Sequence, residues 1–319
     1  MNFSVIGLGS FGIKRAQSIK ESKNAKLVNV YDLNLETANK ASALLNVPNV
    51  QYQDILNDKN IDVVCICTPN KFHKDIIIDL INNNKNIFCE KPLAKNLEEA
   101  EYIYNKITKS NKILQVGSNH RFFESVKYAK KIVDEGALGE ILSFNGRIGH
   151  NGERLKNSWF WKKDISGGGT LLDNGCHLLD LARYFIGDFT SGKGLVSNSY
   201  WKNIDVEDTA GGVFTTNTGK MATIFCSWRL MSGYFFFEIN GSEGYINVDG
   251  RFDTHGGDKI FWSLKSEKNF FTKDFSDIKP DSYKQEIDSF VFNLKNNKEC
   301  RPSAKDALEV MKMIDLIYN

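Results

Sequence analysis

A glycine-rich segment near the amino terminus constrains the fold of this chain more than any other feature. Residues 3–6 are a short apolar run that predicts a strand, the string Gly7-Leu-Gly9-Ser-Phe-Gly12 follows, and residues 13–19 have helical character. Gly7 permits a tight turn, Gly9 lets the backbone approach a pyrophosphate, and Gly12 lets the helix pack on the strand. The amides at the helix N-terminus then face the phosphates. The segment predicts the opening of a Rossmann dinucleotide-binding domain, with Ser10 and Phe11 also beside the cofactor.

A second predicted strand, residues 27–31, ends in Asp32, twenty residues after Gly12. A carboxylate at this place can accept hydrogen bonds from both ribose hydroxyls of the adenosine, and it repels a 2′-phosphate. We therefore expect NAD as the cofactor rather than NADP. Lys14 and Arg15 weaken that preference, because either cation could serve a phosphate. The alternative is that the glycines form an ordinary turn and Asp32 caps a loop, with no role in cofactor binding. The order strand, glycines, helix, strand and acidic residue argues against this alternative.

Strands and helices continue to alternate as far as residue 120. Helices are predicted at 36–45, 74–83 and 97–109, and strands at 50–52, 61–67, 86–89 and 113–116. The run 61–67 is almost wholly apolar, as expected of a central parallel strand. It ends at Thr68-Pro69-Asn70 with His73 just beyond, and doubly wound sheets bind ligands at the carboxyl ends of their strands. We expect Thr68, Pro69, Asn70 and His73 beside the ribose and nicotinamide, although a histidine at a helix start more often makes a local hydrogen bond.

The predicted strand 86–89 runs into Glu90-Lys91-Pro92, where the proline prevents the strand from continuing. Lys91 is thereby placed at the carboxyl edge of the sheet, close to the expected nicotinamide. There it can donate a hydrogen bond to a substrate oxygen, and Glu90 is expected beside the cofactor. Taken alone, a lysine at a strand end is more often a surface residue.

A chain of 319 residues suits two domains, since single cores stop growing near roughly 250 to 300 residues. After residue 120 helices are predicted at 123–135, 170–185, 283–294 and 303–318, and strands at 141–147, 210–215, 221–228, 234–240, 245–248 and 260–264. Glycine-containing turns between successive strands are hairpin signals. The sequence thus predicts an α/β fold with a Rossmann domain at 1–120. An α+β domain with a largely antiparallel open sheet follows at 121–319, and its closing helices are free to pack on the first domain.

Polar side chains recur along one face of the helix predicted at 170–185. Asp173, His177, Asp180 and Tyr184 follow one another at steps of four, three and four, which places them on one stripe. Such a stripe is usually a solvated face. Asp173 and His177 at i and i+4 could also share a metal ion, but no third ligand at metal-site spacing is visible, so no metal is expected.

The segment 149–169 is polar and aromatic, and its pattern is too irregular for a core. His150, Arg154 and Trp161 therefore suit the wall of a sugar-binding site. Alternatively, Trp159 and Trp161 fill the junction between the domains.

Charge and apolar patterning exclude several classes of partner. Lys plus Arg number 41 against 39 Asp plus Glu, which leaves no charge excess to attract nucleic acid or an anionic membrane. No stretch approaches the ~18 to 20 apolar residues of a membrane span. Six isolated cysteines indicate reduced thiols rather than a zinc site, so we expect a cytoplasmic protein.

An apolar sheet face has to be buried against something. Phe235-Phe236-Phe237 and Trp228 give both faces of the predicted open sheet an apolar character. This pattern predicts a homodimer or homotetramer that assembles through the sheet.

These residues resemble the Gfo/Idh/MocA oxidoreductases, a family named for glucose-fructose oxidoreductase and inositol dehydrogenase. The matching motifs extend over most of the chain and are Gly7-x-Gly9-x-x-Gly12, Thr68-Pro69-Asn70 with His73, Glu90-Lys91-Pro92, Gly117-x-x-x-Arg121-Phe122 and Asp173-x-x-x-His177-x-x-Asp180. The resemblance implies that Lys91, Asp173 and His177 are catalytic, and it also points to an oligomer. On the same basis, Asn119 is assigned to the cofactor and Arg121 to the substrate.

The resemblance implies an NAD(P)-dependent dehydrogenase acting on a CH–OH group of a sugar, cyclitol or nucleotide-linked sugar. Such a reaction needs a proton acceptor and a donor to the developing alkoxide. His177 can accept the proton at neutral pH and Lys91 can stabilise the oxygen, but a desolvated Lys91 could be the base instead. Asp173 would bind a neighbouring hydroxyl, and Asp180 would support the site.

Two other functions are compatible with the resemblance. Some relatives of this fold are NAD-dependent glycosidases, which oxidise a sugar transiently and cleave its glycosidic bond. A few others are non-catalytic nucleotide sensors. Sensors tend to lose the lysine or the histidine, whereas this chain has both Lys91 and His177.

Overall fold

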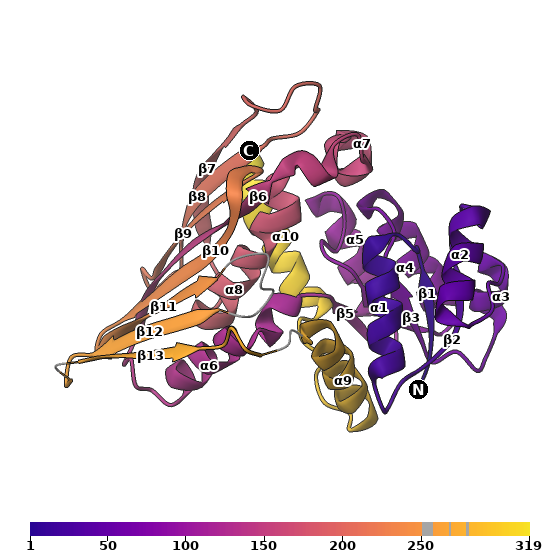
Figure 1. The fold of residues 1–319 in the computed structure, drawn as a ribbon, viewed down its shortest axis with the longest axis horizontal. Helices are drawn as coiled ribbons and strands as arrows, with labels where there is room; N and C mark the ends of the chain where they lie inside the picture. Colours follow the sequence, from indigo (N-terminus) through magenta and orange to yellow (C-terminus); the bar gives the residue numbers. More distant parts are fainter. Residues whose placement is uncertain (251–257, 268, 279–280) are drawn as a thin grey trace. The chain divides into compact units, whose positions relative to one another are not determined.

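The computed structural model describes residues 1–250, 258–267, 269–278 and 281–319. The chain divides into two compact units, each with its own sheet (Figure 1). The first unit comprises residues 1–118 and 283–308, and the second comprises residues 119–282 and 309–319. The first boundary thus lies two residues before the one expected, and most of the carboxy-terminal segment groups with the first unit.

Five parallel strands form the sheet of the first unit, in the order β2-β1-β3-β4-β5. These strands are β1 (Asn2–Ile6), β2 (Lys26–Tyr31), β3 (Val63–Ile66), β4 (Asn86–Cys89) and β5 (Leu114–Val116). The helices are α1 (Ser10–Glu21), α2 (Leu35–Leu45), α3 (Tyr52–Asn57), α4 (His73–Asn82), α5 (Leu97–Ile107) and α9 (Ser282–Lys295). Strand β3 is buried at every position, as expected of a central strand. The prediction of a Rossmann-type parallel sheet is confirmed.

The strand predicted at 50–52 is wrong. Asn49 makes only an isolated parallel bridge to β2, and helix α3 begins at Tyr52. The carboxylate of Asp54 accepts a hydrogen bond from the Gln51 amide at 3.0 Å, which satisfies a donor at the helix start. Local capping therefore outweighed the β propensity of this short segment.

The sheet of the second unit has eight strands in the order β13-β12-β11-β10-β6-β9-β8-β7, and only the β6–β9 pair is parallel among the described residues. The strands are β6 (Ile141–Asn151), β7 (Ser191–Ser197), β8 (Thr209–Thr215), β9 (Met221–Ser227), β10 (Arg229–Gly241), β11 (Gly244–Gly250), β12 (Lys259–Leu264) and β13 (Phe270–Asp274). The expected largely antiparallel sheet is confirmed.

The two edge strands of this sheet, β7 and β13, were not expected from the sequence. Strand β7 contains two glycines, which are depleted in strands and weaken the pattern. Every residue of β13 is exposed, so no alternation of apolar and polar residues marks it. Edge strands pair on one side only, and their sequences carry less of the burial signal.

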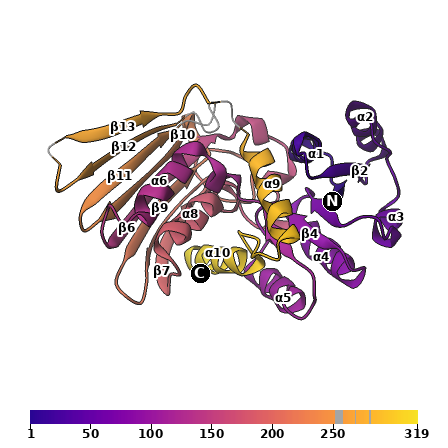
Figure 2. The same ribbon diagram turned by 90° about the horizontal axis from the view of Figure 1, so that it is seen from below.

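Helices α6 (Glu124–Asp134) and α8 (Cys176–Ile186) lie on one face of the eight-stranded sheet (Figure 2). The inward side chains of Phe144, Phe235 and Phe237 are at most 3% exposed. The other α-helices of the described residues are α7 (Lys163–Ser166) and α10 (Ala304–Tyr318). Among the described residues, no helix combines the length and the apolar composition that crossing a membrane requires.

The opposite face of the sheet is less apolar than the sequence predicted. Phe236 points to it, but Phe235 and Phe237 point inward. Its centre is polar, because Thr223 donates to Asn145 at 2.7 Å and Asn145 donates to Glu238 at 3.3 Å. Exposed apolar side chains on this face lie toward its two ends. Over β7, β8 and β9 they are Leu195 (83% exposed), Val213 (43%), Met221 (47%) and Phe225 (38%), and over β11 and β13 they are Tyr245 (37%) and Phe270 (68%).

Candidate functional site

The glycine turn between β1 and α1 has the geometry that a dinucleotide requires. Gly7 has a φ of +88°, and a Cβ there would lie 2.7 Å from the carbonyl carbon of Cys67. A Cβ at Gly12 would lie 1.9 Å from the Gly7 carbonyl oxygen. A Cβ at Gly9, in contrast, would meet nothing within 4 Å. Two glycines therefore serve close packing, and the third leaves open space at the N-terminus of α1, where Ser10 is exposed.

Asp32 lies just after β2 and is tied to this turn. Its Oδ2 accepts a hydrogen bond from the Leu8 amide at 2.7 Å, and its Oδ1 accepts one from the Asn34 amide at 2.8 Å. Each carboxylate oxygen has two acceptor positions, so the ribose hydroxyls can still be bound. The turn and the carboxylate together fit the adenosine diphosphate part of NAD.

The buried guanidinium of Arg15 is committed to protein carboxylates. Nε pairs with Glu90, Nη1 lies 2.6 Å from Glu286, and the side chain is 1% exposed. The group also lies 4.6 Å from the ring centroids of both Phe88 and Tyr283. Arg15 therefore does not serve a phosphate, which removes one of the two reservations about NADP.

Glu286 of helix α9 completes this cluster. Its Oε1 accepts a hydrogen bond from the Ser118 amide at 2.5 Å. Burial raises the pKa of Glu286 to about 7, although the charge of Arg15 acts to lower it. The helix near the end of the chain is thus bound into the nucleotide-binding unit by a charged contact in its interior.

His73 connects two loops at the carboxyl edge of the parallel sheet. Nε2 lies 2.9 Å from the Thr68 carbonyl and Nδ1 lies 3.0 Å from the Pro92 carbonyl, and the side chain is fully buried. Burial lowers the pKa of His73 despite these two contacts. This geometry favours the local bonding role over direct contact with a cofactor. The loop Thr68-Pro69-Asn70 nevertheless follows β3 at the expected edge.

Lys91 follows β4 at the same edge and is half-buried. Its neighbour Glu90 is 9% exposed and forms an ion pair with Arg15. The Glu90 carboxylate is therefore engaged in a contact within the protein. Burial raises the pKa of Tyr283 to about 12, and the positive charges of Arg15 and Lys91 act against that rise. The ammonium group of Lys91 thus lies within electrostatic reach of the Arg15 cluster.

In the second unit, the helix predicted at 170–185 begins with a π-helical turn, Leu171–Gly175, before α8. Glu207 accepts hydrogen bonds from the Gly169 and Leu171 amides, both at 2.9 Å, and from the Tyr318 hydroxyl at 2.9 Å. Burial raises the pKa of Glu207, while these bonds act to lower it. Glu207 therefore fixes the start of the helix that carries Asp173 and His177.

The polar stripe on this helix is buried rather than solvated. His177 is 7% and Asp180 5% exposed, and the side chain of Asp173 is 10% exposed. The Asp173 carboxylate accepts a hydrogen bond from Nε1 of Trp228 at 3.1 Å and lies 3.5 Å from Nε2 of His150. Buried polar side chains need such partners, and a buried stripe is stronger evidence for function than a solvated one.

His177 and Asp180 have separate neighbours. The ring of His177 stacks on that of His120, with centroids 3.8 Å apart. Asp180 accepts hydrogen bonds from Nε and Nη2 of Arg121 at 2.8 and 2.6 Å, and Arg121 also lies over the ring of Tyr184 at 4.7 Å. Arg121 therefore supports the helix, and its assignment to the substrate stays a prediction.

The segment 149–169 is more regular than expected. Strand β6 continues to Asn151, and short helical turns follow. Trp161 is 6% exposed and packs in a small core cluster with Leu155, Ile204, Val206 and Trp228. Trp161 thus fills the interior of the second unit, and Arg154 is exposed. Substrate contacts of His150, Arg154 and Trp161 stay predictions, of which His150 is the one beside Asp173.

Asn119, expected beside the cofactor, groups with the second unit and donates from Nδ2 to the Ser282 hydroxyl at 3.2 Å. Asn119 is 8% exposed. Its assignment to the cofactor therefore stays a prediction. Within the described ranges, no group of three or more His, Cys, Asp or Glu is arranged to hold a metal ion.

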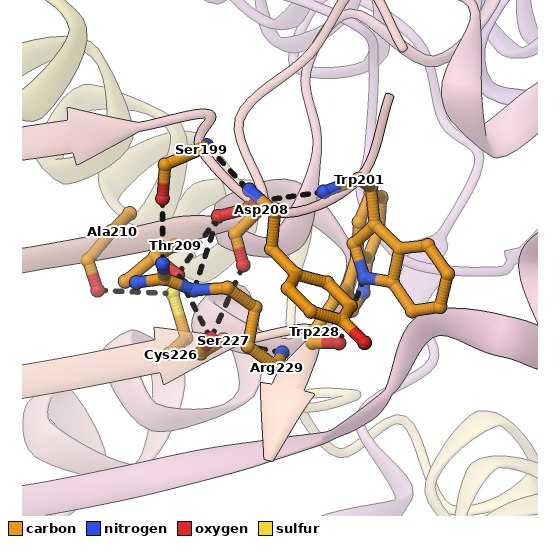
Figure 3. A network of polar contacts seen from close by, with 10 residues as sticks. Ser199, Trp201, Asp208, Thr209, Ala210, Cys226, Ser227, Trp228 and Arg229 are labelled. Carbon is orange, nitrogen blue, oxygen red and sulfur yellow. Dashed lines mark hydrogen bonds and ion pairs between the residues drawn. The ribbon is translucent and has the colours of Figure 1, made fainter. Parts of the chain in front are cut away.

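A network around Asp208 was missed by the sequence analysis (Figure 3). Asp208 is fully buried, and its Oδ2 accepts hydrogen bonds from the amides of Ser199, Tyr200 and Trp201 at 2.8 to 3.3 Å. Its Oδ1 lies 3.4 Å from Nε of Arg229. The available signal was an acidic pair, Glu207-Asp208, between apolar residues at the start of a predicted strand.

Comparisons with known proteins agree with this geometry. A family model described as "Oxidoreductase family, NAD-binding Rossmann fold" matches residues 1–118, and a model described as "GFO/IDH/MocA C-terminal domain" matches residues 126–247. The chain is 30% identical over 255 residues to 2,7-anhydro-N-acetylneuraminate hydratase of Escherichia coli, covering 78% of this chain and 68% of that protein.

A second relative and a solved structure match over greater length. Myo-inositol 2-dehydrogenase of Thermotoga maritima is 29% identical over 325 residues, which cover 96% of this chain and 92% of that one. A structure of levoglucosan dehydrogenase in complex with NADH and levoglucosan superposes with a TM-score of 0.90 at 26% identity, covering 100% of this chain and 96% of that chain.

Proposed function

Because this chain belongs to the Gfo/Idh/MocA oxidoreductase family, we propose that it transfers a hydride between NAD and a secondary hydroxyl of a sugar, cyclitol or nucleotide-linked sugar. The observation that carries this proposal is the buried Asp173–His177 stripe, present in a chain whose glycine turn and Asp32 fit NAD. The relatives named as an inositol dehydrogenase and a levoglucosan dehydrogenase support a polyhydroxylated substrate.

Three side chains are proposed to act on the substrate. Bound NAD supplies the hydride acceptor when an alcohol is oxidised. His177 takes the hydroxyl proton, Lys91 donates a hydrogen bond to the same oxygen, and Asp173 binds a neighbouring hydroxyl. Proton removal by Lys91 is the alternative, because a lysine near a positive nicotinamide can lose its proton. In both assignments, one side chain removes the proton of the reacting hydroxyl and the other donates a hydrogen bond to its oxygen.

A substrate screen tests the proposal directly. The purified protein is incubated with NAD and a panel of sugars, cyclitols and UDP-sugars, and NADH formation is followed by absorbance. At least one compound is expected to give turnover that disappears in Lys91→Ala. If no compound reduces NAD, and none of the corresponding ketones oxidises NADH, the proposed reaction is wrong.

A second function is favoured by one comparison. The relative from Escherichia coli is named a hydratase rather than a dehydrogenase. An enzyme that oxidises its substrate transiently and restores the hydride at the end needs no added NAD and shows no net reduction. Incubating the protein as purified with glycosides and anhydro-sugars, without added NAD, distinguishes the two. Release of an aglycone or a hydrated product, with no NADH formed, favours the second function.

We also propose that the open face of the eight-stranded sheet forms the interface of a homodimer or homotetramer. Leu195, Val213, Met221 and Phe225 expose apolar surface on this face. Light scattering should give a multiple of the 36.1 kDa chain mass, and Met221→Glu should lower it. A monomer at micromolar concentration would exclude this assembly. The cytoplasmic location stays a prediction, which fractionation of expressing cells can test.

A further inference from the structure

The carboxylate of Asp173 is held by side chains that the proposed reaction does not use. The indole Nε1 of Trp228 donates a hydrogen bond to Asp173 Oδ2 at 3.1 Å, and Nε2 of His150 lies 3.5 Å from the same oxygen. Trp228 is fully buried. A hydrogen bond to an ionised acceptor in such surroundings is stronger and more directional than one between neutral groups in water.

Trp228 is itself fixed by its backbone. Its amide donates to the Asp208 carbonyl at 2.8 Å, and its carbonyl accepts from the Gly152 amide at 2.8 Å. The same carbonyl also accepts from the indole of Trp201 at 3.0 Å (Figure 3). Asp208 in turn holds the chain at residues 199–201. The indole ring packs in the core cluster of the second unit. Its N–H therefore has one direction, which is toward Asp173.

His150 plays a different part at the same carboxylate. Its Nδ1 lies 2.7 Å from the Asn151 carbonyl, and because a carbonyl only accepts, Nδ1 carries a hydrogen. Nε2 then faces Asp173, but it lies 3.5 Å from Oδ2, at the long limit of a hydrogen bond. The indole nitrogen of Trp228 lies 3.1 Å from the same oxygen, within the usual range. Trp228 is thus the donor with the better hydrogen-bond geometry at this carboxylate.

We propose that Trp228 is the positioning residue of Asp173, and that its indole N–H sets the orientation of the Asp173 carboxylate. This inference rests on the proposed function, in which that carboxylate binds a substrate hydroxyl. Orientation of a binding group affects the reaction through the substrate, since small errors of placement are costly. Loss of the N–H should therefore lower kcat/KM for the sugar and leave NAD binding intact. A purely structural role of Trp228 would affect both.

Substitutions at position 228 test this in the full-length enzyme. Trp228→Phe removes the donor and part of the ring, and replacement by the isosteric β-(3-benzothienyl)alanine removes only the N–H. Both are expected to lower kcat/KM by roughly 10- to 100-fold, the range for a hydrogen bond to a charged group, with the Kd for NAD within about twofold of wild type. Trp262→Phe, which removes an indole of strand β12, is the matched control. If the isosteric variant retains wild-type kcat/KM, the proposal is wrong.

The contact can also be measured without any substrate. In ¹⁵N-tryptophan-labelled protein, the indole signal of Trp228 is the one absent from Trp228→Phe. Asp173→Asn should move this signal upfield, and Asp205→Asn, at an exposed carboxylate of the same unit, should not. An unmoved signal in Asp173→Asn would overturn the contact. The signal could also move in Asp173→Asn while no tested sugar supports NAD reduction by the wild-type protein. That result would support the contact and refute the proposed reaction.

A double-variant cycle connects the two measurements. Because Trp228 is proposed to act through Asp173, adding Trp228→Phe to Asp173→Asn should cause little further loss of kcat/KM. Additive losses would show that Trp228 acts independently of the carboxylate, against the proposal.

Discussion

Two clusters of buried carboxylates, one in each unit, are held in different ways. In the first unit, the carboxyl groups of Glu90 and Glu286 share the permanent positive charge of the Arg15 guanidinium. In the second unit, Asp173 is oriented by the neutral indole of Trp228. A shared cation compensates charge and connects helices to strands, whereas a neutral donor orients a carboxylate without cancelling its charge. The first arrangement suits a scaffold, and the second suits a group that must bind a ligand.

Removal of Arg15 should give the largest effect on stability. Arg15→Met leaves two carboxylates without their partner in the interior, and breaking a buried pair costs about 3 to 5 kcal/mol of the free energy of unfolding. Urea denaturation measures the loss. The neighbouring exposed Lys14→Met is the control and should change stability by less than about 0.5 kcal/mol. The double variant Arg15→Met/Glu286→Gln should recover part of the loss; no recovery would mean that Arg15 stabilises by packing alone.

Removal of either proposed catalytic group should abolish most of the activity without affecting NAD binding. Lys91→Ala and His177→Ala are each expected to lower turnover by at least ~10²-fold, the scale of a general acid or base. Steady-state rate assays measure the loss of turnover, and NAD titrations show whether cofactor binding is affected. Lys95→Ala, which alters a lysine of the same segment paired with Glu99, is the control and should retain activity. Near-normal turnover in both test variants would refute the mechanism.

The charged cluster should also make the stability of the protein depend on pH. The pKa of Glu286 is raised from 4.5 to about 7, so the folded state binds its proton more tightly than the unfolded state. The free energy of unfolding should therefore fall as the pH rises from about 4.5 to about 7, by up to about 3 kcal/mol. In Glu286→Gln this slope should be smaller in urea denaturation between pH 5 and 8. Parallel curves for the two proteins would contradict the assignment.

The same contrast explains which parts of the site the sequence could predict. The glycine turn and Asp32 lie in one short stretch, and their chemistry depends on spacing along the chain, so the pattern was sufficient. The partners of Arg15 and Asp173 are distant: Glu286 lies far along the chain in helix α9, and Trp228 is 55 residues from Asp173. Periodicity placed Asp173, His177 and Asp180 on one stripe but could not show that the stripe is buried, because burial depends on strands elsewhere in the sequence.

The smallest predicted effect concerns cofactor choice and depends on the commitment of Arg15. Lys14 and Arg15 are the two cations that could bind the 2′-phosphate of NADP. Arg15 is paired with Glu90 and Glu286, so only Lys14 of these two could do so, and the Asp32 carboxylate repels the phosphate. Wild type should bind NAD more tightly than NADP, and Asp32→Asn should narrow the ratio of the two Kd values by about 10-fold, as expected for loss of one unfavourable charge contact. The asparagine carbonyl can still accept from the Leu8 amide, so the turn should stay folded. Nicotinamide fluorescence titrations give both constants, and equal or tighter binding of NADP by wild type would refute the role given to Asp32.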